Sequence, residues 1–300
     1  MLRLASLAAL AAFAALGLAA CGGGGKPRPD LLYVSTKSGV YAVWEMNADG
    51  NRQRRLTSGG GKPSSPSELF FQLQPAWSPD GKLIAFSGHG DIRVVDESGK
   101  DERQLTSTAA DDTHPSFSPD GRRIAFQRGT SLWMMNADGS GAHRVLEVDN
   151  AAARAPAWSP NGTWIAYSRD FTGTPVREIW LVHPDGTGAH RLTTLNASAN
   201  TPAWSPDGKQ IAFSDDARVG GFKIWLIDAN GRGLHRLTSN STAQEIDPAW
   251  APENGRLAFS SDGAIVTTTA DGTTVTAITN PKDNDSSPAW NPVPPPAKGS

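Results

Sequence analysis

The sequence predicts an all-β fold, a six-bladed β-propeller of four-stranded antiparallel blades, from three observations. First, a motif like Pro75-Ala76-Trp77-Ser78-Pro79-Asp80-Gly81 occurs six times, beginning at Pro75, Pro115, Pro156, Pro202, Pro248 and Pro288. Second, successive copies are 40, 41, 46, 46 and 40 residues apart, close to the roughly 40 to 45 residues of a propeller blade. Third, only short β-prone runs and turn residues lie between the copies, and no helical periodicity competes with them.

Each interval between motifs contains the signals for the rest of a blade. After the motif at Pro156, β-prone runs cover residues 164–168, 179–182 and 189–193, which together with the motif make four strands. The Ser-Pro-Asp-Gly part of the motif is typical of a turn, because proline presets φ, aspartate bonds the local backbone and glycine accepts a positive φ. A second turn, mostly Asp-Gly or Asn-Gly, follows each third strand. These signals indicate antiparallel meanders.

The two ends of the repeat region are incomplete in complementary ways. Residues 31–57 supply three outer strands with no motif before them, and the motif at Pro288 has no strands after it. We expect the two parts to form one blade, so that the N- and C-terminal strands pair and close the ring. The propeller is then expected to span residues 30–292, followed by a disordered, proline-rich tail at 293–300.

The first 29 residues have the composition of an export signal and a tether. Residues 1–20 combine Arg3 with an apolar run that ends in small residues before Cys21, the only cysteine of the chain. This order resembles the lipobox of bacterial lipoproteins, which implies cleavage before Cys21, lipidation of that residue and an extracytoplasmic, membrane-anchored location. An ordinary secretory signal is the alternative, and the number of membranes in the envelope stays open. Residues 21–29 are expected to form a flexible tether.

Composition and missing motifs narrow the function. A formal net charge of −2 offers no basic footprint for nucleic acid, and a single cysteine allows no intramolecular disulfide. The sequence contains neither a Gly-x-Ser-x-Gly nucleophile motif nor a His-Glu-x-x-His zinc motif. We therefore expect a non-enzymatic monomer without a metal or another cofactor. The alternative is a propeller that binds a small molecule, sugar or cation, with or without weak hydrolase or lyase activity.

Aromatic and histidine residues recur at fixed places in the repeat. Five tryptophans lie in the motif, four in third strands and one, Trp164, in a second strand. We interpret them as packing between blades rather than as a platform for sugars. His143, His190 and His235 share one place in the fourth strand and are interpreted as structural or surface residues.

The repeated unit resembles that of a known family. Pro-Ala-Trp-Ser-Pro-Asp-Gly-Lys-x-Ile-Ala-Phe-Ser, then Ile-Trp-Leu and then His-Arg-Leu-Thr, is similar to the TolB-type β-propeller repeat, and the resemblance covers nearly everything from Asp30 to Pro292. It implies that the motif forms the innermost strand of each blade. It also implies an envelope protein or peptide as the partner. The separate N-terminal α/β domain of TolB is not expected, since Asp30 comes only nine positions after Cys21.

Three intervals are longer than the repeat requires and are predicted to form an interaction surface. The extra residues fall in 59–74, 169–177 and 215–223. In an antiparallel four-stranded meander, the loops after the second and fourth strands leave from one end of the blade, so these insertions should share a face. We expect their phenylalanines to contact a partner, or alternatively to pack on their own blades. They are Phe70, Phe71, Phe171 and Phe222.

The segments that lead into the inner strands on the same face are mostly acidic. We expect them to surround the channel entrance and to attract a cation or the basic part of a peptide. Solvated turn residues are the alternative. The residues concerned are Asp111, Asp112, His114, Asp149, Arg154, Glu245, Asp247, Asp283 and Asp285.

Overall fold

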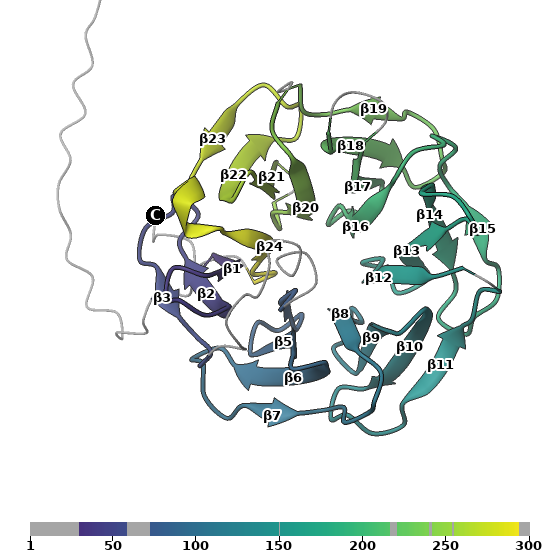
Figure 1. The fold of residues 1–300 in the computed structure, drawn as a ribbon, viewed down its shortest axis with the longest axis horizontal. Coiled ribbons are helices and arrows are strands. Elements are labelled where there is room, and N and C mark those ends of the chain that lie inside the picture. The colour runs from purple at the N-terminus through teal and green to yellow at the C-terminus, as the bar shows by residue number, and fades with distance from the viewer. Residues whose placement is uncertain are drawn as a thin grey trace, which may run out of the picture.

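The computed structural model describes residues 30–58, 73–149, 151–216, 221–239, 242–253 and 255–293. Within these ranges the chain forms six four-stranded antiparallel sheets, arranged as blades around a central axis (Figure 1). The predicted six-bladed propeller is thereby confirmed. Cys21, Phe70 and Phe71 lie outside the described residues, as do the predicted signal and tether and residues 294–300 of the predicted tail.

The ring closes within one blade that contains strands from both ends of the described chain. From the axis outward, this first blade consists of β24 (Ser286–Trp290), β1 (Leu31–Ser35), β2 (Ala42–Met46) and β3 (Arg54–Arg55). β24 and β1 are antiparallel, with Leu31 opposite Trp290. Beyond the strands, the Asn291 N–H donates to the Asp30 carbonyl at 2.9 Å. The expected pairing of the terminal strands is confirmed.

The other five blades follow the order of the chain, each from its inner to its outer strand. The second contains β4 (Ala76–Trp77), β5 (Leu83–Gly88), β6 (Asp91–Asp96) and β7 (Arg103–Gln104). The third contains β8 (Asp112–Phe117), β9 (Arg123–Arg128), β10 (Ser131–Asn136) and β11 (His143–Leu146). The fourth contains β12 (Ala153–Trp158), β13 (Ile165–Asp170), β14 (Arg177–Val182) and β15 (His190–Arg191).

The last two blades return the chain to the point of closure. The fifth contains β16 (Asn200–Trp204), β17 (Gln210–Asp215), β18 (Lys223–Asp228) and β19 (His235–Arg236). The sixth contains β20 (Glu245–Trp250), β21 (Arg256–Ser261), β22 (Ala264–Thr269) and β23 (Val275–Ala277). A 3-10 turn, η2 (Pro281–Asp283), then leads to β24. In the described part of the chain, no helix is long and apolar enough to cross a membrane.

The hydrophobic core is divided into clusters that lie between neighbouring blades. Between the first and second blades, Trp77 belongs to one buried cluster with Val34 and Val43. Between the third and fourth blades, Trp158 lies with Met134 in the same way. The motif aromatic residues that are buried are Trp77, Phe117, Trp158, Trp250 and Trp290. Their expected use in packing between blades is confirmed, so adjacent blades stabilise one another.

Glycines in the turns between third and fourth strands bring adjacent blades into close contact. Gly99 has a φ of 81°, and a Cβ on it would lie 2.5 Å from the carbonyl oxygen of Leu56, in the preceding blade. A Cβ on Gly50 would lie 2.1 Å from the carbonyl oxygen of Ile278. Only glycine allows both the positive φ and the approach of the two backbones. These glycine turns are therefore contacts between blades as well as chain reversals.

Candidate binding site in the central channel

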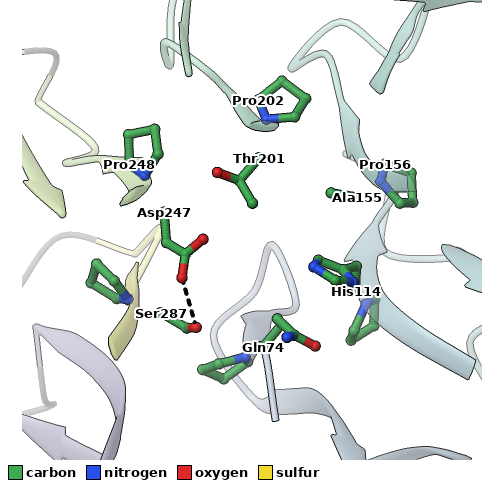
Figure 2. Close-up of a pocket in the computed structure, with 12 residues that line it drawn as sticks. Gln74, His114, Ala155, Pro156, Thr201, Pro202, Asp247, Pro248 and Ser287 are labelled. Carbon is green, nitrogen blue, oxygen red and sulfur yellow. Dashed lines mark hydrogen bonds between the residues drawn. The ribbon is translucent and has the colours of Figure 1, made fainter. Parts of the chain in front are cut away.

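A cavity of about 150 Å³ at the propeller axis is lined by the same two positions of every blade. These positions are the motif proline and the residue before it, as Figure 2 shows. The residues before the prolines are Gln74, His114, Ala155, Thr201, Asp247 and Ser287. Because the prolines repeat and their predecessors differ, the cavity is an apolar ring that presents six side chains of different chemistry.

A repeated irregularity of the backbone directs these side chains to the axis. Five of the six have a positive φ, between 46° and 54°: His114, Ala155, Thr201, Asp247 and Ser287. At the same place the pairing of inner and second strands shifts register in five blades, as expected of a β-bulge. A positive φ in residues other than glycine costs on the order of 1 kcal/mol each, and such strain concentrates at functional sites.

Asp247 and Ser287 form the polar side of the cavity. The Ser287 hydroxyl donates to Asp247 Oδ2 at 3.1 Å (Figure 2). Burial raises the pKa of Asp247 to about 6, against the hydrogen bonds from Ser287 and Thr201, which favour the charged form. Asp247 keeps an exposed edge toward the cavity, and no described basic residue contributes to its pKa. At neutral pH it is a carboxylate with no cation of the described residues paired to it.

His114 lies across the ring from Asp247 (Figure 2). Burial lowers its pKa to about 4, and the nearby Arg154 guanidinium adds to the effect. His114 Nδ1 lies 3.1 Å from the Thr113 hydroxyl. The imidazole is therefore neutral at physiological pH, and the other side chains that line the cavity are not ionisable. Asp247 thus supplies the one formal charge among the described residues of the lining.

Two of the nine residues predicted at the entrance, His114 and Asp247, line this cavity. Three others share one repeat position, three residues before the motif proline, and are buried: Asp112, Glu245 and Asp285. Arg128 donates two 2.7 Å hydrogen bonds to Asp112. The Thr238 hydroxyl donates to Glu245. The Ser35 and Thr279 hydroxyls lower the pKa of Asp285 by hydrogen bonding. Burial raises the pKa of Glu245, and that of Asp285 to about 6. These three carboxyls are not presented to the entrance.

The remaining four predicted residues lie closer to solvent. Asp111 and Asp149 are exposed, whereas Arg154 and Asp283 are partly buried. Arg154 forms an ion pair of 3.0 Å with Asp170. Asp149 and Arg154 line a second, open cavity of about 550 Å³ together with the loop after β13. The segment after the fourth strand β11 and the loop after the second strand β13 thus lie on the same face of the propeller.

The two described phenylalanines of the insertions are only partly available to a partner. Phe171 is partly buried, with the Arg191 guanidinium 5.4 Å from its ring centroid. Its loop is closed by a 3.0 Å hydrogen bond from its own N–H to the Val176 carbonyl. Phe222 is also partly buried, and its N–H donates to Gln244 Oε1 at 3.1 Å.

Sequence reasoning missed four residues that line the cavity: Gln74, Ala155, Thr201 and Ser287. The sequence analysis selected His114 and Asp247 because their side chains are ionisable. These four have side chains that do not ionise, and they look like ordinary residues between strands. A usable signal does exist. The residue before the motif proline differs in every blade although the motif that follows it recurs, as expected where a symmetric scaffold presents an asymmetric site.

Comparisons with known proteins agree with this architecture. The structure resembles TolB from Acinetobacter baumannii with a TM-score of 0.70 and 22% identity over 88% of this chain, and the match spans 66% of that chain. It also resembles a chain of a nidogen/laminin complex (TM-score 0.70, 11% identity, 87% of this chain and 98% of that one). A third similar fold is in the tricorn protease (TM-score 0.59, 18% identity, 84% and 26%).

These structural likenesses, all at low identity, concern the fold. Among curated proteins, no sequence match was found. A family model is more specific, because the TolB β-propeller domain matches residues 127–294, more than half of the chain. That range contains the motif copies from Pro156 onward and both Asp247 and Ser287. The chain belongs to the TolB β-propeller domain family.

Proposed function

We propose that this protein is a non-enzymatic scaffold of the bacterial cell envelope that binds a protein partner at its channel, through a basic side chain that reaches Asp247. The observation that carries the proposal is the unpaired carboxylate on the axis. Its neighbours are hydroxyl and amide groups from Ser287, Thr201 and Gln74, which suit the three N–H donors of a lysine ammonium. Calcium usually takes six to eight oxygen ligands, more than this set offers.

The size of the cavity also favours a single side chain over a larger ligand. About 150 Å³ is the volume of a protein cavity that holds one benzene molecule. The lining prolines are rigid, so the cavity is preformed. The rest of the partner would then lie on the entrance face, where Phe171 and Phe222 supply apolar surface. Phe70 and Phe71, outside the described residues, stay predicted contacts.

The proposed attachment to a membrane rests on Cys21. Cleavage before Cys21 and lipidation there would make residues 21–29 the tether. Asp30, where the tether would end, is hydrogen bonded to Asn291 just beyond the last inner strand, whereas the cavity-lining Ser287 lies near the start of that strand. The tether would therefore join the face opposite the entrance, which leaves the channel free to meet a partner. Incorporation of labelled palmitate by the wild type and not by Cys21→Ser is the expected result.

The binding proposal can be tested with an envelope extract. We expect immobilised wild-type protein to retain a partner that the Asp247→Asn variant loses. Asp111→Asn is the matched control, because Asp111 is an exposed acid of the same segment type that does not line the cavity. If all three proteins retain the same set of envelope proteins, the carboxylate does not mediate binding and the proposal fails.

A further inference from the structure

We infer that the outer strand β23 (Val275–Ala277) pairs with β23 of a second copy of this chain, in antiparallel orientation about a two-fold axis at Thr276. This inference does not rest on the channel or on its proposed partner. It departs from the monomer expected from the sequence. It rests on three features of the outer strands, namely their charge, their exposure and the direction of their peptide groups.

β23 differs from every other outer strand in the described part of the propeller. The other five contain arginine: β3, β7, β11, β15 and β19. By contrast, the ten residues from Gly272 to Pro281, which include β23, contain no charged side chain. Val275 is 57% exposed, the higher value of the two exposed large hydrophobic side chains among the described residues. Its sheet therefore ends in an uncharged, partly apolar edge.

Charge on an edge strand prevents it from pairing with another copy. Two identical strands that pair about a two-fold axis place like residues near one another, so arginine in the strand would oppose the contact. Soluble proteins commonly protect their sheet edges in this way. Because five blades have the protection and the sixth lacks it, β23 is the edge on which a second copy can add.

The peptide groups of β23 are arranged to pair with themselves. The Ile278 N–H donates to the Ile265 carbonyl at 2.9 Å, and the Thr274 carbonyl accepts from the Thr269 N–H at 3.1 Å. Since peptide groups alternate in direction along an antiparallel strand, those of Thr274, Thr276 and Ile278 point to β22, and those of Val275 and Ala277 point outward.

A two-fold axis at Thr276 satisfies all the outward groups of both copies. It places Val275 of one copy opposite Ala277 of the other, as hydrogen-bonded pairs on either side of the axis. Thr276 then faces Thr276 of the second copy as a non-hydrogen-bonded pair, with Cα atoms about 4.5 Å apart. Such an isologous contact ends at two copies, and this self-complementarity is why we assign the edge to a second copy.

Disulfide formation tests this register directly. Cys21 is the one native cysteine, so each variant, made in the full chain with Cys21→Ser, has one thiol. Thr276→Cys should form a covalent dimer under mild oxidation, because Cα atoms about 4.5 Å apart lie within the range of disulfides. Thr274→Cys is the matched control, since its two copies would be separated by four residues, or about 13 Å, along the strands.

Sedimentation of the unmodified protein tests the association itself. We expect a concentration-dependent dimer, weakened about tenfold or more by Val275→Lys, which places a charge at two points of the contact. Leu234→Lys, at the other exposed large hydrophobic residue, should leave it unchanged. Equal loss in both variants would make general apolar contact the cause and overturn the proposal. A wild-type protein that stays monomeric at all concentrations would also overturn it. So would β23 amides that become protected from hydrogen exchange only when an extended peptide is added, because the edge would then bind a different partner.

Discussion

Replacing Asp247 with asparagine should stabilise the propeller, although Asp247 is the residue proposed to bind the partner. A carboxyl whose pKa rises from 3.8 to about 6 on folding disfavours the folded state by roughly 3 kcal/mol once it is fully charged. The stability that the protonated carboxyl provides is fully present below pH 3.8, and it is lost as the pH rises from there through about 6. Asparagine stays neutral and still offers an oxygen to the Ser287 hydroxyl, so the variant avoids the loss. Because Asp247 is only partly buried, solvent screens its charge, which makes roughly 3 kcal/mol an upper value.

Urea unfolding of both proteins at pH 4, 5.5 and 7.5 measures this effect. The two should have similar stability at pH 4, and the advantage of Asp247→Asn should grow to its full size by pH 7.5. In a thermal scan the same difference corresponds to a melting temperature higher by roughly 6 to 12 °C. A variant that is no more stable than the wild type at pH 7.5, or a difference independent of pH, would refute the reasoning. Asp111→Asn, at an exposed site, is the control.

Three further predictions concern the groups around this site and the contacts between blades. Because the pKa of His114 falls to about 4 on folding, the stability that its neutral form provides is lost as the pH falls from about 6.5 to 4. Urea unfolding should therefore show His114→Gln gaining stability relative to the wild type across that window. Arg128→Met leaves Asp112 buried and unpaired, and urea unfolding at pH 7.5 should show a loss of about 3 to 5 kcal/mol. Gly99→Ala should lower the melting temperature more than Gly39→Ala, because both glycines have a positive φ but only Gly99 lies against a carbonyl; equal effects would exclude the clash.

Much of the scaffold follows from local rules that a sequence displays. The motif places a strand before a proline-aspartate-glycine turn, and its period sets the size of a blade. The missing motif at one end and the unaccompanied motif at the other predict the β24–β1 pairing that closes the ring. The blades need no knowledge of tertiary contacts, because hydrogen bonding between successive strands is local in the chain. The closure joins distant strands, but it follows from counting which strands are missing at each end.

The insertions were harder to interpret from the sequence. The alternating direction of the strands predicts that loops after second and fourth strands share a face. The cavity lined by Asp149 and Phe171 joins two such segments. Whether an apolar loop residue is free depends on what surrounds it. Phe171 lies under the Arg191 side chain, and sequence spacing does not reveal such a contact.

The sequence by itself determined the blades, their number, their order and the closure, and it placed acidic residues near the start of the inner strands. Only the tertiary structure decided which acid reaches the axis. In a regular strand, residues two apart face the same side, so Glu245 and Asp247 would point in one direction. The positive φ at Asp247 and the register shift between Ile246 and Ala249 break this alternation. Glu245 is buried with the Thr238 hydroxyl, whereas Asp247 turns into the channel.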